Sequence, residues 1–222
     1  MSTPSSQPVG PAVSLAPPLP PVGTTSVRAV LLDADGVLQF IGTPWYRALS
    51  EGGGEPFAKA LLSREGPALS GRESLRDLLE RLVVELDLAR GADELMALWR
   101  QATPDPPAWQ LVRELRAAGY LTVLATNQHE ERREWMRTAL DYDGLCDVDA
   151  YSCIVGAAKP APEYFLGALE MAGVDADQAL FVDDSAENIS AAAALGLRTV
   201  HHPTDAGGRA LRSELVEVLS AA

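Results

Sequence analysis

The sequence has few cysteines and histidines, and it has no long apolar stretch. Its two cysteines, Cys146 and Cys153, are too few for a disulfide scaffold, and no spacing of Cys and His typical of a zinc site is present. A reducing compartment such as the cytoplasm is therefore predicted. No run of about 18 apolar residues occurs, so no membrane-spanning helix is predicted, and no membrane partner is expected.

Basic residues are also scarce, and lysine is the scarcer of the two types. The 222 residues contain 18 Lys and Arg against 31 Asp and Glu, a formal net charge of −13, and only Lys59 and Lys159 are lysines. Such a charge repels phosphate backbones, which argues against general binding to nucleic acid or to an anionic membrane surface. An anionic substrate would need a local pocket that holds a cation or a metal ion.

The first 26 residues contain no charged side chain and hold seven of the sixteen prolines. A segment of this composition cannot form a packed core, so residues 1–26 are predicted to be a disordered, Pro-rich tail. The segment lacks the positive start and the unbroken apolar stretch of a secretory signal, so export is not indicated.

From residue 28 onward, short apolar runs alternate with amphipathic stretches. Strands are expected at five places: 29–32, 121–125, 151–155, 180–182 and 198–200. Helices are expected near four others: 107–118, 129–140, 161–172 and 185–195. Strands that alternate with helices indicate a parallel sheet covered on both faces. The predicted fold class is therefore α/β, with a doubly wound parallel sheet.

One interval, residues 41–104, breaks this alternation with helical periodicity and no convincing strand. One helical stripe is formed by Leu75, Leu78, Leu79, Leu82, Val83 and Leu86. Because a βα connection needs few residues, this interval is predicted to be an inserted helical cap, with residues 27–40 and 105–222 as the core. The insertion leaves from the carboxyl end of the first strand, where open α/β sheets bind ligands, and this position suits a lid.

Pairs of acidic residues end two of the predicted strands. Asp33 and Asp35 follow the first, and Asp183 and Asp184 end the fourth. Either pair alone could be a surface turn or a helix N-cap. Together they place up to four carboxylates at one sheet edge, where their repulsion calls for a cation. Mg²⁺ is the usual ion where a phosphate shares the site. An EF-hand is excluded, because the twelfth residue from Asp33 is Pro44.

Two further segments lie at the same predicted edge. Thr126, Asn127 and Gln128 end the second strand and precede a helix, whose N-terminal N–H groups could hold an anion. Lys159 follows the third strand, and a lysine there supplies a compact positive charge in a chain that otherwise uses arginine.

In order along the chain, these motifs resemble those of the haloacid dehalogenase superfamily. Asp33-Ala34-Asp35-Gly36-Val37 is similar to the first motif of this superfamily, and Thr126 is similar to the second. The third motif is matched by Lys159-Pro160, and the fourth by Asp183-Asp184 with Ser185 and Asn188. The insertion point resembles that of members with a helical cap. More narrowly, the chain resembles the subgroup that contains bacterial sugar-phosphate phosphatases and the N-terminal phosphatase domain of soluble epoxide hydrolases.

The resemblance implies a Mg²⁺-dependent phosphatase that acts on a small phosphorylated metabolite through an aspartyl-phosphate. It implies that Asp33 is the nucleophile and Asp35 the general acid and base. It also implies that Mg²⁺ is held by Asp33, by the backbone carbonyl of Asp35 and by Asp184, with Asp183 bound directly or through water. The phosphoryl oxygens would bind three other residues: Thr126, the Asn127 backbone and Lys159.

Three alternatives remain beside this prediction. A phosphosugar mutase uses the same scaffold, and a metal-independent dehalogenase uses an Asp nucleophile but lacks the second acid of the first motif, which Asp35 supplies here. A non-catalytic binding protein is disfavoured because every catalytic position is filled. The sequence does not predict the substrate or the oligomeric state.

Several other polar residues and one glycine-rich segment are predicted to lie outside the functional site. His129 is predicted to be a solvated residue at a helix start, and Arg132, Arg133 and Arg137 are predicted to form a solvated helix face. The glycine-rich segment 51–55 lacks the Gly-Lys-Ser/Thr of a P-loop and is expected to be a loop or hinge of the cap.

Overall fold

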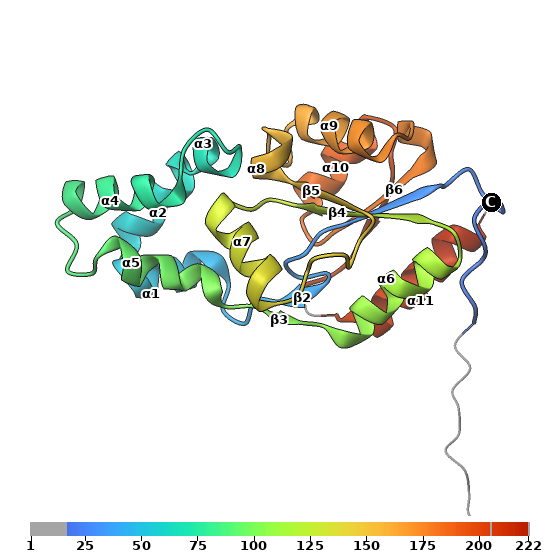
Figure 1. The fold of residues 1–222 in the computed structure, drawn as a ribbon, viewed down its shortest axis with the longest axis horizontal. Helices are drawn as coiled ribbons and strands as arrows, with labels where there is room; N and C mark the ends of the chain where they lie inside the picture. Colours follow the sequence, from blue (N-terminus) through green and yellow to red (C-terminus); the bar gives the residue numbers. More distant parts are fainter. Residues whose placement is uncertain (1–16, 205, 222) are drawn as a thin grey trace, which may run out of the picture.

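The computed structural model describes residues 17–204 and 206–221 and contains a five-stranded parallel sheet with helices on both faces (Figure 1). The strand order is β5-β4-β1-β6-β7, with β1 at the centre. The strands are β1 (Ala29–Leu32), β4 (Leu121–Thr126), β5 (Val148–Tyr151), β6 (Ala179–Asp183) and β7 (Arg198–His201). This confirms the predicted doubly wound α/β fold.

The two faces of the sheet have separate hydrophobic cores. On one face, Val30 and Leu32 pack with residues of α6 (Pro106–Ala117), α7 (Glu130–Ala139) and α11 (Gly208–Ser220). On the other face, Ala29 and Leu31 pack with residues of α9 (Pro162–Ala172) and α10 (Ala186–Ala194). All four residues of β1 are fully buried, as expected for a central strand that alternates between two apolar layers.

The predicted strand at 151–155 is wrong for most of its length. β5 ends at Tyr151, and Ser152–Val155 form the short helix α8. The Ser152 hydroxyl accepts a hydrogen bond from the Gln128 backbone N–H at 2.9 Å and donates to the Gln128 carbonyl at 3.2 Å. This anchor turns the chain before the apolar residues 154 and 155, whose composition had suggested a strand.

The insertion after β1 consists of short helices with a hydrophobic core of its own. Its elements are α1 (Trp45–Gly53), α2 (Glu55–Arg64), α3 (Gly66–Leu69), α4 (Leu75–Glu85), α5 (Ala92–Met96) and the 3₁₀ helix η1 (Ala97–Arg100). Buried residues of α1, α2, α4, α5 and η1 form one cluster. In Figure 1 these helices lie beyond one end of the sheet, beside α7. The segment predicted to be a glycine loop mostly continues α1, and only Gly54 breaks the helix.

Both ends of the insertion are joined in a two-stranded ribbon that the sequence did not predict. β2 (Gln39–Phe40) pairs antiparallel with β3 (Thr103–Pro104), so that Phe40 lies opposite Thr103. The ribbon is fixed to the core, because the Leu38 carbonyl accepts hydrogen bonds from the Asp105 N–H at 3.0 Å and from the Trp109 indole at 3.1 Å. The chain therefore leaves and re-enters the core at one place.

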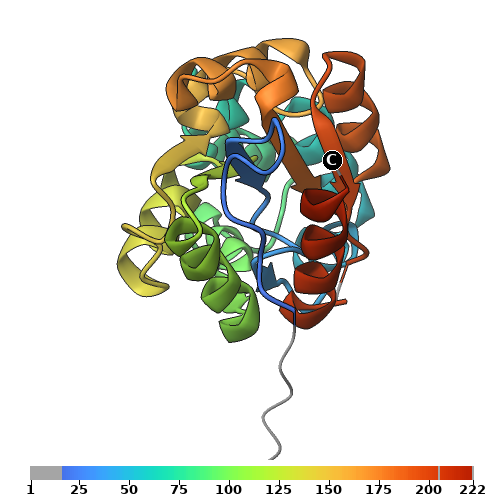
Figure 2. The same ribbon diagram turned by 90° about the vertical axis from the view of Figure 1, so that its right-hand side faces the viewer.

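The predicted disordered tail covers residues 1–26, of which 1–16 lie outside the described residues. Residues from Leu19 onward contact the core, which differs from the prediction. Leu19 packs against one hydrophobic core, and the Val22 N–H donates to the Ala118 carbonyl at 2.9 Å. Figure 2 shows this segment crossing the end of the sheet opposite the insertion. Composition alone missed it, because single apolar residues between prolines can still cover an exposed core edge.

No helix in the part of the chain that the structure describes has the length and hydrophobicity of a membrane-spanning segment. Cys146 and Cys153 are both free thiols.

Helices α6 and α11 approach so closely that a methyl group on Gly208 would overlap the backbone nitrogen of Ala108. We expect Gly208→Ala to lower the free energy of unfolding by about 1–3 kcal/mol, because the packed backbones cannot separate without opening the core. Gly66→Ala is the matched control, since Gly66 is also helical and has no neighbour within 4 Å of an added methyl group. Denaturant unfolding of both variants measures the difference, and equal stabilities would contradict this account of the helix contact.

Candidate active site

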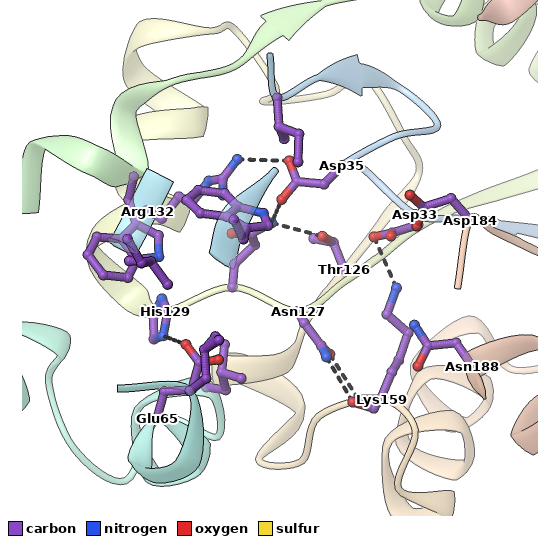
Figure 3. Close-up of a pocket in the computed structure, with 17 residues that line it drawn as sticks. Asp33, Asp35, Glu65, Thr126, Asn127, His129, Arg132, Lys159, Asp184 and Asn188 are labelled. Carbon is purple, nitrogen blue, oxygen red and sulfur yellow. Dashed lines mark hydrogen bonds and ion pairs between the residues drawn. The ribbon is translucent and has the colours of Figure 1, made fainter. Parts of the chain in front are cut away.

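A cavity of about 280 Å³ lies at the carboxyl ends of β1, β4 and β6, between the core and the insertion (Figure 3). Six residues of the predicted site line it: Asp33, Asp35, Thr126, Asn127, Lys159 and Asp184. The carboxyl ends of parallel strands share one edge, so residues far apart in the sequence converge there. Asp183 lies behind this group and is fully buried.

Asp33 and Lys159 form a buried ion pair at the base of the cavity. The Lys159 ammonium lies 3.0 Å from Oδ1 of Asp33 and 2.6 Å from Oδ2 of Asp183, and it also donates to the Ala125 carbonyl at 2.8 Å. The pKa of Asp33 is raised to about 7, chiefly by burial, because the charges of Asp183 and Asp35 add to the effect of burial and Lys159 offsets only part of it. Burial alone would lower the pKa of Lys159, but the charges of Asp33 and Asp183 outweigh this and raise it.

Asp183 serves chiefly to hold its neighbours in place. Its Oδ1 accepts hydrogen bonds from the Ser185 N–H at 2.8 Å and from the Asn188 amide at 3.0 Å, while Oδ2 accepts the Lys159 ammonium. These bonds satisfy both oxygens of a carboxylate that is shielded from solvent. Asp183 thereby fixes the position of Lys159 and of the first turn of α10.

Asp184 faces the cavity, and Gly36 gives it room. Gly36 has a φ of 79°, in the region that favours glycine, and a methyl group there would overlap Oδ2 of Asp184. The same Oδ2 accepts a hydrogen bond from the Thr204 hydroxyl at 2.6 Å. Burial raises the pKa of Asp184, the Thr204 hydrogen bond lowers it, and the charge of Asp183 raises it again.

The donor set at this edge fits a divalent cation. Carboxylate oxygens of Asp33, Asp183 and Asp184 lie within 4.8 Å of one another. The four carboxylates of the site face two cationic side chains, Lys159 and Arg132, which leaves two formal negative charges. Hard oxygen donors with this excess charge are the ligands that Mg²⁺ prefers.

Asp35 is held by side chains from three different segments. Its Oδ1 accepts hydrogen bonds from the Gln39 amide at 2.7 Å and from the Arg132 guanidinium at 2.8 Å, and Oδ2 accepts from Gln128 at 3.4 Å. Gln39 is fixed in turn, because its Oε1 accepts the Tyr142 hydroxyl at 2.9 Å. Asp35 therefore lies at the junction of β1, the ribbon and α7.

Thr126 and Asn127 shape the part of the cavity next to α7. The Thr126 hydroxyl accepts a hydrogen bond from the Gln128 amide at 3.0 Å. The Asn127 side chain is paired with the Lys159 backbone, through Lys159 N–H to Oδ1 at 2.8 Å and Nδ2 to the Lys159 carbonyl at 2.9 Å. This pair of hydrogen bonds joins the two loops and occupies the Asn127 side chain, so the Asn127 main chain is the part that could bind an anion.

His129 and Arg132 are not solvated, and the predictions for both are wrong. Each is about 3% exposed. Nε2 of His129 lies 3.3 Å from Oε2 of Glu65 in the insertion, and Arg132 lies against the Trp45 ring, with 4.5 Å from its central carbon to the ring centroid. Their spacing of three residues at the start of α7 puts both on the face toward the site, which was the available signal. Nothing local indicated that the insertion would cover that face.

The comparisons with known proteins agree on one family. Residues 27–196 match the family described as haloacid dehalogenase-like hydrolase. Phosphatase MT3486 of Mycobacterium tuberculosis is 31% identical over 192 residues, which covers 78% of this chain and 86% of that protein.

Solved structures show the same fold. The HAD family enzyme bt-2542 of Bacteroides thetaiotaomicron, crystallised as a magnesium complex, superposes with a TM-score of 0.71 at 21% identity, covering 84% of this chain and 98% of that one. L-2-haloacid dehalogenase of Xanthobacter autotrophicus superposes with a TM-score of 0.57 at 22% identity, covering 78% and 76% of the two chains. The fold is thus shared with a magnesium-bound HAD family enzyme and with a dehalogenase.

Proposed function

Because the chain belongs to the haloacid dehalogenase-like hydrolases, we propose that it is a Mg²⁺-dependent phosphatase of small phosphorylated metabolites. One observation carries the proposal: two acids on one strand end, Asp33 and Asp35, share a cavity with Lys159 and Asp184. This set supplies a nucleophile, a proton carrier, a fixed cation and a metal-facing carboxylate. The similarity to a mycobacterial phosphatase supports the same activity.

In the proposed reaction, a carboxylate oxygen of Asp33 attacks phosphorus and the bond from phosphorus to the ester oxygen breaks. Asp35 gives its proton to the departing alkoxide, which leaves as an alcohol. Asp35 then accepts a proton from a water molecule that attacks the aspartyl-phosphate. The bond between phosphorus and Asp33 breaks, inorganic phosphate leaves, and both acids return to their starting state.

Fixed charges and N–H groups would stabilise the phosphoryl group during both steps. Lys159 is already held beside Asp33 by Asp183 and the Ala125 carbonyl, so no reorganisation is needed when negative charge develops. The Thr126 hydroxyl and the Asn127 main chain line the same end of the cavity. We assign these three residues to binding of the phosphoryl oxygens.

Asp33, the backbone carbonyl of Asp35 and Asp184 would hold the Mg²⁺. Asp183 already accepts hydrogen bonds from Lys159, Ser185 and Asn188, and it would contribute to the metal site directly or through water. A bound Mg²⁺ supplies charge neutralisation and orientation of the phosphoryl group.

The alternatives differ from the proposal at named points. A dehalogenase needs no second acid, whereas Asp35 is present here and is held by Gln39 and Arg132. A phosphosugar mutase would return the phosphoryl group to a sugar instead of passing it to water. A cytoplasmic location and the lack of a nucleic-acid partner remain predictions from composition.

The proposal is tested by release of inorganic phosphate from 4-nitrophenyl phosphate, with Mg²⁺ and with a chelator. We expect release that depends on Mg²⁺, and acid quenching should trap one phosphoryl group on the peptide that contains Asp33. Halide release from 2-chloropropionate without phosphate release would support the dehalogenase and overturn the proposal. Conversion of one sugar monophosphate to another without phosphate release would support the mutase.

Asp184→Ala should raise the Mg²⁺ concentration for half-maximal activity by at least about tenfold, because the ion loses one anionic ligand. The stability of the protein without metal should not fall, since burial raises the pKa of Asp184 and its charge is unfavourable there. Metal titrations of activity measure the effect, with the exposed Asp77→Ala as control. An unchanged midpoint in Asp184→Ala would contradict its role at the metal.

A further inference from the structure

The side of the cavity that faces the carboxylates is almost wholly apolar and comes from the insertion. Six of its side chains are apolar or aromatic: Ile41, Trp45, Leu49, Leu62, Leu69 and Trp99. The opposite side comes from the core and carries the proposed phosphoryl site. A phosphate ester bound there would direct its organic part against the apolar wall.

The aromatic part of this wall is packed against other side chains. Trp45 stacks on Trp99 with ring centroids 6.1 Å apart and an interplanar angle of 26°, and Trp99 meets the edge of His129 at 5.8 Å. Arg132 packs against the Trp45 ring at 4.5 Å. These contacts join the insertion to α7 and hold flat apolar surface against the site.

The charged groups near this wall face one another, while Nε of Arg132 and both ring nitrogens of His129 have no hydrogen-bond partner among the described residues. The Arg132 guanidinium bonds to Asp35 at 2.8 Å, and the His129 ring lies 3.3 Å from Glu65. Glu65 is the acidic group on the insertion side of the cavity. These three nitrogen atoms are shielded from solvent and the six side chains of the wall are apolar, so the several hydroxyls of a sugar would outnumber the partners here. A second anion would meet the charge of Glu65.

The size of the cavity limits the ligand further. At about 280 Å³ it lies at the lower end of the range of about 300–1,000 Å³ for small-molecule sites, and the phosphoryl group occupies part of it. The remaining space suits one ring or a short branched chain.

We propose that the leaving group of the substrate is a compact apolar or aromatic alcohol that carries no second anionic group. The substrates are then monophosphates of such alcohols, and polyhydroxylated sugar phosphates and diphosphates bind poorly. This inference rests on the proposed phosphatase activity, and it names the substrate class of that same site. Burial of apolar surface against the tryptophans favours such a ligand, whereas a sugar carries more hydroxyls than the wall has free polar atoms.

A matched pair of esters tests the apolar preference. Cyclohexylmethyl phosphate and glucose 6-phosphate both carry a six-membered ring on a primary alkoxide, so ring polarity is the main difference between them. With the full chain and Mg²⁺, we expect kcat/KM for cyclohexylmethyl phosphate to be higher by at least about tenfold, because each unpaired buried hydroxyl costs binding. Equal efficiencies, or a preference for the sugar, would overturn the inference while leaving the phosphatase proposal intact.

A variant pair tests whether the wall causes this preference. Leu62 lines the cavity and is 41% exposed, so Leu62→Asn adds a polar group there with little risk to folding. It should lower kcat/KM for cyclohexylmethyl phosphate several-fold and leave glucose 6-phosphate unchanged or improved. Val84→Asn is the control, since Val84 is exposed on the insertion away from this cavity. Equal effects of the two variants would contradict the role of the wall.

A second pair of esters tests the exclusion of anions. Benzyl phosphate and 4-carboxybenzyl phosphate have similar leaving groups but differ in charge, and we expect the carboxylate to reduce kcat/KM at least about tenfold. Glu65→Gln should narrow this difference. If the carboxylate has no effect, the exclusion of anions is wrong. If none of the four esters releases phosphate, the proposed function itself fails, and the inference fails with it.

Discussion

Asp33→Asn is expected to reduce phosphate release by at least about a thousandfold, because an amide cannot form the aspartyl-phosphate. The fold should persist, since the amide oxygen can still accept the Lys159 ammonium that now lies 3.0 Å from Oδ1. The measurement is phosphate release from 4-nitrophenyl phosphate at saturating Mg²⁺, with mass analysis to exclude deamidation back to Asp. Substantial turnover by verified Asn protein would contradict the assignment of the nucleophile.

The same variant tests a pH dependence of stability that we expect in the wild-type protein. Burial raises the pKa of Asp33 to about 7, so between about pH 4 and pH 7 the folded protein holds a proton that the unfolded chain has lost. The stability of the wild-type protein without metal therefore falls across this window as pH rises, and the Asn variant lacks this loss. We expect the melting temperature of the variant relative to wild type to be higher at pH 8 than at pH 5. An identical difference at both pH values would argue against the raised pKa.

Lys159→Met is expected to remove activity and to lower the free energy of unfolding by about 3–5 kcal/mol at neutral pH. The ammonium is nearly inaccessible and faces Asp33 and Asp183, so its loss leaves two carboxylates buried beside each other without a cation. Methionine keeps most of the side-chain volume, which separates the loss of charge from the loss of packing.

The other lysine of the chain provides the control for this variant. Lys59 is exposed and pairs with Glu55 on the surface of α2, so Lys59→Met should change stability by less than about 1 kcal/mol. The destabilisation by Lys159→Met should grow from pH 5 to pH 8. The Lys159 charge lowers the pKa of Asp33, so without it the folded protein keeps the Asp33 proton to a higher pH and loses stability over a wider pH range. Similar stabilities of the two lysine variants would show that the buried pair contributes little.

The parts of the fold that could be predicted depend on short-range patterns. Four of the five predicted strands are confirmed, and three of them, β1, β4 and β6, are mainly apolar runs followed by polar residues. Parallel strands bring those ends to one edge whatever the loops do. That geometry explains why Asp33, Lys159 and Asp184 could be placed near one another from sequence. Their chemical roles remain proposals.

The parts that escaped prediction depend on long-range packing. Arg132 and His129 look like surface residues of α7, and only the arrival of Trp45, Trp99 and Glu65 from the insertion makes them buried. The contact of Leu19 with the core likewise involves residues far along the chain. No periodicity within one element encodes such contacts, so composition alone suggested solvent.

The short ribbon of β2 and β3 makes the insertion an exchangeable module. Phe40 and Thr103 lie opposite each other, and both strands are fixed to the core through Leu38 and Asp105. A segment of different length or shape could therefore replace the intervening residues without moving β1 or the acids that follow it. Evolution of this scaffold can then change the substrate wall while β1 keeps its acids in place, and the contact of Arg132 with Trp45 and Asp35 is the link that each new wall must preserve or replace.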